Sequence, residues 1–227
     1  MFQFYLRKDT KNNMYEREKD EIIHSALVLK EYRLIALSGG NVSLRMPEGH
    51  ILVTPSGMLY ETMVTSDVVV LDSEGKVIEG TRKVSVDTDA LLYIYKRLSH
   101  VNSIIHTHQV YASAVGAVYD ELPAIVTTLP NACLGSIKVA PFTSAASLDM
   151  GVVAVDYLKD RRAVILKSHG VLAVGGTLKE ALYSAIYLED AAKTFIMAKV
   201  LGNPVVLTDK QVEEAVGKFK PGAYGQG

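Results

Sequence analysis

Three histidines have the residue type and spacing from which a metal-dependent reaction could be built. His106 and His108 stand two residues apart at the end of a strand-like run. Side chains two apart on a strand project from the same face, so both imidazoles can reach one ion. His169 lies between two short β-like runs and is followed by Gly170, which lets the backbone bend close to a site. Three imidazoles with one open position are typical of a catalytic metal centre.

The alternative for the His-x-His pair is a strand end with one core and one solvated histidine. The other three histidines, His24, His50 and His100, fall within a helix or in polar turns, and we interpret them as structural or solvated. Imidazole and carboxylate ligands suit several divalent ions. We therefore expect Zn²⁺ at the three-histidine site, with Mn²⁺ or Co²⁺ as alternatives.

Asp87 is the best carboxylate for this centre, because it opens the helix that leads into the histidine strand. Aspartate is also a common helix N-cap, and the sequence leaves these two roles open. Two turn-forming runs, Ser38-Gly39-Gly40-Asn41 and Ser56-Gly57, offer backbone N–H groups, an amide and hydroxyls that could cradle a phosphate. Neither run matches the P-loop or dinucleotide patterns, and ordinary hairpin turns are the alternative.

The elements that must position these residues follow from apolar periodicity. Helices are expected over residues 15–33, 91–98, Val110–Val118, 147–158, 177–200 and 208–219. Thr177 with Glu180, and Thr208 with Gln211, predict capping boxes for the last two. Strands are expected over 51–54, 68–71, 103–106, Ala163–Leu166 and 171–174. Helices and short strands intermix without a linker, so the pattern predicts one α/β or α+β domain over residues 1–227.

Composition narrows the function classes. The chain has 227 residues, of which 48% are hydrophobic and 22% charged, and its net charge is −1. This charge gives no reason to expect nucleic acid as a partner, and no apolar run is long enough for a membrane span. The N-terminal residues lack the order of a signal peptide, and the single Cys133 excludes an internal disulfide. We expect a cytoplasmic protein with Cys133 buried rather than reactive.

Taken together, the motifs resemble those of the class II aldolase/adducin-type family, from about residue 15 to residue 224. In the family's order they are Gly40-Asn41-Val42-Ser43, Thr54-Pro55-Ser56-Gly57, Ser85-x-Asp87, His106-x-His108, Ser168-His169-Gly170 and Tyr224-Gly225. The resemblance implies an α/β fold with a central, mainly antiparallel sheet flanked by helices. It also implies a homotetramer with active sites at subunit interfaces.

The resemblance assigns roles residue by residue. His106, His108 and His169 match the family's metal ligands, and Asp87 matches an acidic residue that binds the metal or acts as a base. Tyr224 matches a C-terminal tyrosine that completes a site. The phosphate-binding positions of the family are matched by Asn41, Ser56, Gly57 and Ser85.

Three departures concern the substrate. Val86 stands where the family usually has a second serine, which removes one hydroxyl from the expected phosphate pocket. A tyrosine or aspartate that serves proton transfer in relatives is replaced by Thr127 or Asn131, depending on the alignment. Thr54 stands where the epimerase branch has a lysine.

These features favour a metal-dependent aldolase that cleaves a phosphorylated ketose, similar to fuculose-1-phosphate, into dihydroxyacetone phosphate and a short aldehyde. A ribulose-5-phosphate 4-epimerase is the first alternative, supported by residues 79–83, by Asp87-Thr88 and by the Tyr224-Gly225-Gln226 ending. An adducin-like interaction module without chemistry is the second. An enzyme acting on a non-phosphorylated substrate is a third, and Val86 is its support.

Overall fold

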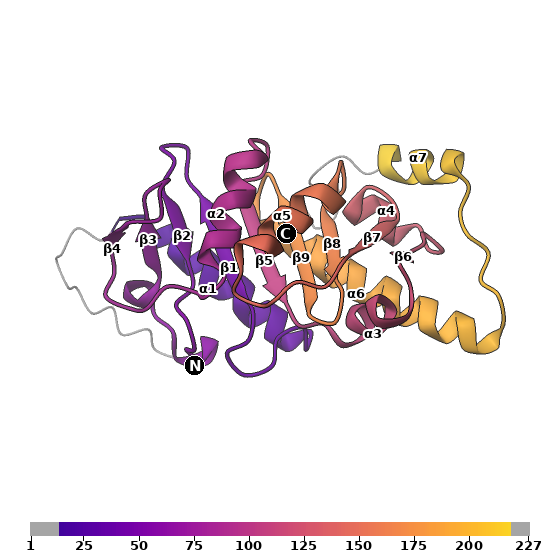
Figure 1. The fold of residues 1–227 in the computed structure, drawn as a ribbon, viewed down its shortest axis with the longest axis horizontal. Coiled ribbons are helices and arrows are strands. Elements are labelled where there is room, and N and C mark those ends of the chain that lie inside the picture. The colour runs from indigo at the N-terminus through magenta and orange to yellow at the C-terminus, as the bar shows by residue number, and fades with distance from the viewer. Residues whose placement is uncertain (1–13, 219–227) are drawn as a thin grey trace, which may run out of the picture.

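The computed structural model describes residues 14–218, and within them nine strands form one sheet (Figure 1). Along the sheet the strands follow the order β4-β3-β2-β1-β5-β9-β8-β7-β6. Their bounds are Asn41–Arg45 (β1), Ile51–Val53 (β2), Val69–Leu71 (β3), Val77–Glu79 (β4), Ser103–Thr107 (β5), Glu121–Leu122 (β6), Ile137–Ala140 (β7), Ala163–Leu166 (β8) and Gly170–Gly175 (β9). All neighbouring strands pair antiparallel except β7 and β8. The predicted fold class, a mainly antiparallel sheet flanked by helices, is confirmed.

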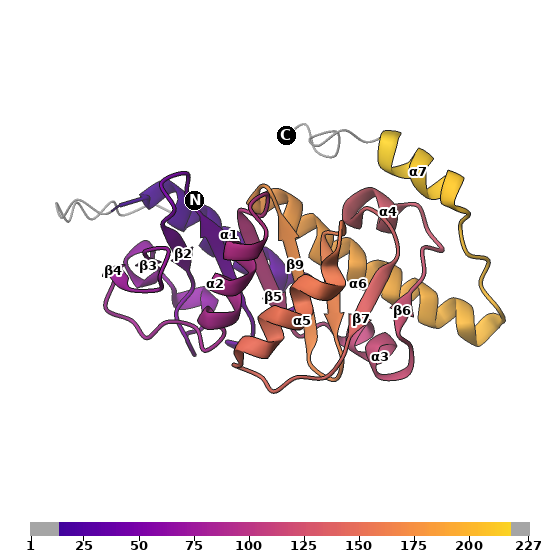
Figure 2. The same cartoon turned by 45° about the horizontal axis from the view of Figure 1, so that its top comes forward.

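Helices cover both faces of this sheet (Figures 1 and 2). Their bounds are Glu16–Glu31 (α1), Thr88–Arg97 (α2), Val110–Val118 (α3), Thr128–Cys133 (α4), Leu148–Leu158 (α5), Leu178–Leu201 (α6) and Asp209–Lys218 (α7), with short 3₁₀ turns at Tyr60–Thr62 and Thr65–Asp67. Helices α2 and α5 pack on one face, and α1, α3, α4 and α6 on the other.

The alternation of strand side chains divides the core into two clusters. On β5, Ile105 faces the cluster under α1 and α6, whereas Ile104 faces the cluster under α2 and α5. On β9, Val171 and Leu172 divide in the same way. Because successive side chains of a strand point to opposite faces, a strand covered on both sides is apolar throughout. This is why β9 reads in the sequence as a continuous apolar run and why two isoleucines are adjacent on β5.

The long helix α6 begins where its capping sequence predicts. The Thr177 side chain accepts a hydrogen bond from the Glu180 backbone N–H at 3.2 Å. The Glu180 carboxylate, however, accepts from the Gly176 N–H at 2.9 Å rather than from Thr177. At α7 the box is complete, since Thr208 N–H donates to the Gln211 side chain at 2.9 Å and Gln211 N–H donates to the Thr208 hydroxyl at 3.3 Å.

Several elements were not expected from the sequence, namely β1, β4, β6, β7 and α4. The most consequential is β1, in which polar residues occupy a central strand. Ser43 is buried and hydrogen-bonds to the Tyr95 hydroxyl at 2.9 Å, and Arg45 donates to the Tyr95 and Ser99 carbonyls at 2.7 Å each. Tertiary partners therefore satisfy polar groups that give β1 no apolar strand pattern.

No helix among residues 14–218 is long and apolar enough to cross a membrane. Cys133 is buried at the end of α4, as expected.

Candidate metal centre

His106 is held at the centre of the sheet, on the strand β5 between β1 and β9. It pairs with Asn41 of β1 on one side and with Leu172 of β9 on the other, and it is buried. Its Nδ1 lies 2.9 Å from the Val171 carbonyl oxygen. A carbonyl only accepts, so Nδ1 carries the proton and Nε2 is left with its lone pair. This arrangement is typical of an oriented metal ligand.

His108 follows the end of β5, and its ring turns toward His106. The two Nε2 atoms lie 3.1 Å apart, and the ring centroids are 4.9 Å apart. Two glycines allow this approach, since a Cβ on Gly39 would lie 3.1 Å from His108 Nδ1 and one on Gly170 would lie 3.2 Å from His108 Cδ2. A Cβ on Gly40 would meet the His106 carbonyl oxygen, and Gly40 has a φ of 74°. These glycines thus bring neighbouring backbone against the histidine pair.

His169 completes the group from the turn between β8 and β9. The preceding Ser168 has a φ of 56°, and the turn places the His169 ring 4.8 Å from that of His106 and 5.4 Å from that of His108. One possible ligand atom from each of the three histidines can be chosen so that all lie within 4.8 Å of one another. The buried Nδ1 of His169 has no hydrogen-bond partner among the described residues.

The electrostatics favour neutral imidazoles at His106 and His169. Burial, together with the neighbouring His169 and His108, lowers the pKa of His106 to about 3. Burial and His108 also lower the pKa of His169, while the Asp87 carboxylate acts in the opposite direction. Neutral imidazoles are the form that binds a metal. Convergent ligand atoms, a fixed tautomer at His106 and an unpartnered Nδ1 at His169 all fit a divalent cation.

Asp87 lies beside this group at the start of α2. It occupies the N-cap position, but its side chain makes no capping hydrogen bond. Its carboxylate instead accepts a hydrogen bond from Asn41 Nδ2 at 2.8 Å, and the same nitrogen lies 3.2 Å from the Ser85 hydroxyl. Asn41, Ser85 and Asp87 are all buried. The fold therefore brings together three predicted site residues from β1 and from the segment that enters α2.

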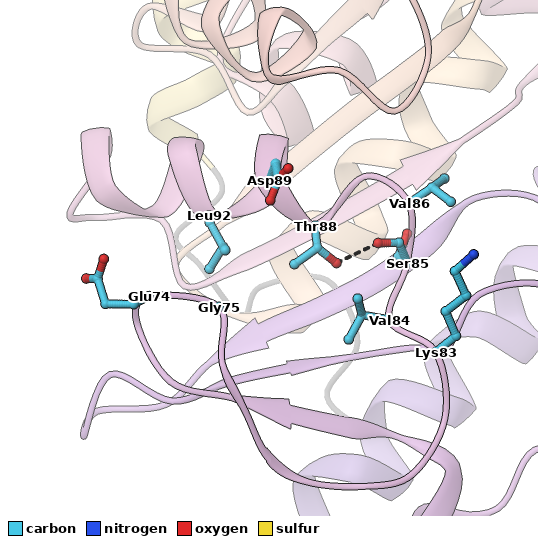
Figure 3. A pocket seen from close by; sticks show the side chains of 9 residues that line it. All are labelled: Glu74, Gly75, Lys83, Val84, Ser85, Val86, Thr88, Asp89 and Leu92. Atoms are coloured by element: carbon cyan, nitrogen blue, oxygen red, sulfur yellow. Dashed lines mark hydrogen bonds between the residues drawn. The ribbon is translucent and has the colours of Figure 1, made fainter.

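The second predicted turn lies against the same segment. The Ser56 N–H donates to the Lys83 carbonyl oxygen at 2.9 Å, and Gly57 follows with a φ of 70°. Ser85 and Val86 also line a cavity of about 300 Å³ (Figure 3), whose lining residues are Glu74, Gly75, Lys83, Val84, Ser85, Val86, Thr88, Asp89 and Leu92. In this view the side chains of Lys83 and Val86 extend on one side of the segment, and Glu74 and Leu92 lie on the other.

Two predicted candidates, Thr127 and Asn131, make no hydrogen bond to the histidines in the described structure. Thr127 precedes α4 and Asn131 lies on it, and α4 packs against α6 and α7. Tyr224 lies outside the described residues.

Lys83 was not singled out from the sequence, although it stands two residues before Ser85. Its ammonium group has no hydrogen-bond or ion-pair partner among residues 14–218, and the residue is exposed. Its backbone carbonyl accepts from the Ser56 N–H, so Lys83 adds a positive charge next to the Ser56-Gly57 turn.

Comparison with known proteins places this geometry in a family. Residues 20–196 match the model of the Class II Aldolase and Adducin N-terminal domain. The chain is 31% identical to the 5-deoxy-D-ribulose 1-phosphate aldolase of Bacillus thuringiensis serovar kurstaki, over 94% of this chain and 99% of the relative. It is also 31% identical to the L-fuculose phosphate aldolase of Escherichia coli K12, over 90% and 94% of the two chains.

Solved structures agree with the sequence relatives. An L-fuculose 1-phosphate aldolase structure superposes with a TM-score of 0.84 at 32% identity, covering 88% of this chain and 94% of the other. Escherichia coli YgbL, described as a putative aldolase/epimerase/decarboxylase, shares the fold with a TM-score of 0.80 at 20% identity, covering 88% and 98%. The chain belongs to the class II aldolase/adducin family, and its relatives indicate a sugar-phosphate aldolase.

Proposed function

We propose that the chain is a metal-dependent aldolase that reversibly cleaves a phosphorylated ketose into dihydroxyacetone phosphate and a short aldehyde. The observation that carries this proposal is the group formed by His106, His108 and His169, whose ligand atoms converge within 4.8 Å. A divalent cation bound there, Zn²⁺ or else Mn²⁺ or Co²⁺, supplies Lewis acidity toward the substrate's carbonyl and hydroxyl oxygens. The aldolase relatives at 31% identity support the same reaction class.

The phosphate of the substrate is assigned to the turns beside Asp87. Ser56, Gly57 and Ser85 offer hydroxyl and backbone N–H groups, and Asn41 stands between them and the histidines. The unpartnered ammonium of Lys83 adds the positive charge that a phosphate requires. These hydroxyl, N–H and ammonium groups support a phosphorylated substrate rather than a neutral one.

Asp87 is assigned the proton transfer. Its carboxylate is buried, is oriented by the hydrogen bond from Asn41, and acts electrostatically on His169. A carboxylate beside the reacting atoms can accept a proton in one direction of the reaction and, as the carboxylic acid, return it in the other. Tyr224 remains our prediction for the aldehyde end of the substrate.

A homotetramer with active sites at subunit interfaces is also part of the proposal. Helix α3 begins two residues after His108, and its first residue, Val110, is largely exposed. Exposed apolar side chains beside a site support a subunit contact there. The cytoplasmic location, and a function without nucleic-acid or membrane partners, stay predictions from the sequence.

A 4-epimerase could use the same bond cleavage, followed by rotation and re-addition of the aldehyde. The aldolase is preferred because the curated relatives that cover nine-tenths of this chain at 31% identity are aldolases. The adducin-like interaction role is not preferred, because all three histidines are present and converge.

A product assay on metal-loaded protein tests the proposal. Fuculose-1-phosphate, 5-deoxyribulose-1-phosphate and ribulose-5-phosphate are supplied separately, and dihydroxyacetone phosphate and xylulose-5-phosphate are measured. Dihydroxyacetone phosphate from either 1-phosphate, lost after chelation, is the expected result. Xylulose-5-phosphate alone would replace the aldolase with the epimerase. The absence of both products would contradict the proposed substrate class.

A further inference from the structure

The segment that follows His108 is bound to one face of helix α6. Gln109 Nε2 donates a hydrogen bond to the Ala185 carbonyl oxygen at 2.9 Å. One helical turn further along α6, the Glu189 carboxylate accepts from the backbone N–H groups of Tyr111 and Ala112, at 2.9 Å each. Three hydrogen bonds thus connect residues 109–112 to a helix that is more than 70 residues distant in the chain.

These hydrogen bonds satisfy the start of α3. The first N–H groups of a helix have no partner within that helix. Gln109 stands at the N-cap position of α3 but makes no side-chain capping bond there. Glu189, which lies on α6, therefore caps the start of α3. Its negative charge lies at the positive end of the α3 dipole. Glu189 is partly buried, and its two carboxylate oxygens make these two hydrogen bonds.

His108 depends on this anchor more than His106 does. His106 is fixed by strand pairing on both sides and by the hydrogen bond from its Nδ1 to Val171. His108 lies beyond the end of β5, and its Nδ1 has no hydrogen-bond partner among the described residues. The path of the backbone immediately after His108 must therefore set the direction of its ring.

We propose that Glu189, assisted by Gln109, is a positioning residue for the metal centre. By holding residues 109–112 against α6, it keeps His108 Nε2 directed at the point that His106 and His169 share. This inference rests on the proposed function in one respect, because it requires that the three histidines bind a metal.

The test compares two glutamate substitutions on the same helix. Glu189→Gln leaves an amide that can accept from only one of the two N–H groups and faces the other with a donor. Glu180→Gln is the matched control, because Glu180 also pairs with a backbone N–H, that of Gly176, and with Arg162 at 2.6 Å, away from the histidines. Co²⁺ affinity, the visible absorption spectrum of bound Co²⁺ and the thermal unfolding midpoint are measured for each full-length variant.

We expect Glu189→Gln to bind Co²⁺ about 10- to 100-fold more weakly than the wild type, with an altered spectrum. Glu180→Gln is expected to lower the unfolding midpoint while keeping the wild-type affinity and spectrum. Wild-type Co²⁺ affinity and spectrum in Glu189→Gln would overturn the inference but leave the proposed function intact. A wild-type protein that binds no Co²⁺ would instead overturn the proposed function, and the inference with it.

Gln109→Met provides a second variant in case Glu189→Gln does not fold. Gln109 is fully buried, and its Oε1 has no partner in the described structure, so methionine removes an unsatisfied polar atom together with the bond to Ala185. We expect this variant to remain folded and to lose several-fold in Co²⁺ affinity. Unchanged affinity in a folded Gln109→Met would show that the contact with α6 does not position His108.

Discussion

Asn41 donates a hydrogen bond from its Nδ2 to the Asp87 carboxylate at 2.8 Å, across 46 residues of sequence. This bond joins the first residue of β1 to the residue that precedes α2. Because Asn41 is also the strand neighbour of His106, the carboxylate is brought beside the histidine group by the pairing of β1 with β5. Asp87 thus makes a hydrogen bond beside the histidine group and none that caps helix α2.

Asp87→Asn tests which role matters. If Asp87 serves proton transfer, this isosteric change should lower the rate of ketose cleavage at least about 100-fold. The free energy of unfolding should change by less than about 0.5 kcal/mol, because the side chain caps no helical N–H. Turnover on a phosphorylated ketose and urea unfolding are the two measurements.

Asp89→Asn is the matched control, since Asp89 lies in the first turn of the same helix and is exposed. It should leave turnover unchanged. A stability loss of about 1 kcal/mol in Asp87→Ala, with turnover preserved in Asp87→Asn, would assign the residue to helix capping instead.

Removing one histidine should remove the metal. His169→Ala takes away a proposed metal ligand that is half-buried in a turn, so the fold should survive while the bound metal per chain falls to near zero after dialysis. Metal analysis and circular dichroism are the measurements, and His24→Ala, an exposed histidine on α1, serves as the control. Full metal content and full activity in His169→Ala would show that the three-histidine site is wrong.

The convergence of these three histidines could be predicted because each stood beside a readable strand. His106 lay near the end of the strand-like run that became β5, and His169 stood between the runs that became β8 and β9. The fold class and the long helix α6 were readable for the same reason, since apolar periodicity and a capping threonine are local signals.

The remaining features depend on contacts that no local pattern records. Strand β1 was missed because Ser43 and Arg45 are polar, and hydrogen bonds to partners distant in the sequence, Tyr95 among them, make them favourable in a central strand. The contact between Glu189 and the start of α3 joins residues 77 and 78 positions apart, and nothing near Glu189 in the sequence indicates it.

Val86→Ser tests the phosphate pocket. Val86 is 55% exposed, so replacing it should cost little stability. If its side chain faces the phosphate, the added hydroxyl should make a hydrogen bond to a charged group and lower KM for the phosphorylated ketose by about tenfold. KM for a non-phosphorylated ketose should stay constant.

Val77→Ser, at an exposed valine of β4, is the control for a surface valine-to-serine change. Equal KM values for Val86→Ser and the wild type on the phosphorylated substrate would place the phosphate away from this position.

Cys133 should be unreactive in the folded protein. Its Sγ is buried between α4 and α6, where it lies 3.4 Å from the Ser184 carbonyl oxygen, and burial raises the pKa of the thiol to about 12. The thiolate is the reactive form, and with this pKa only about one thiol in 10⁴ is ionised at pH 8. Reaction with an aromatic disulfide reagent should therefore be at least ~10³-fold slower in buffer than in denaturant. Its rate should rise with urea in step with the unfolded fraction. Stoichiometric reaction within seconds in native buffer would show instead that the contact between α4 and α6 opens readily.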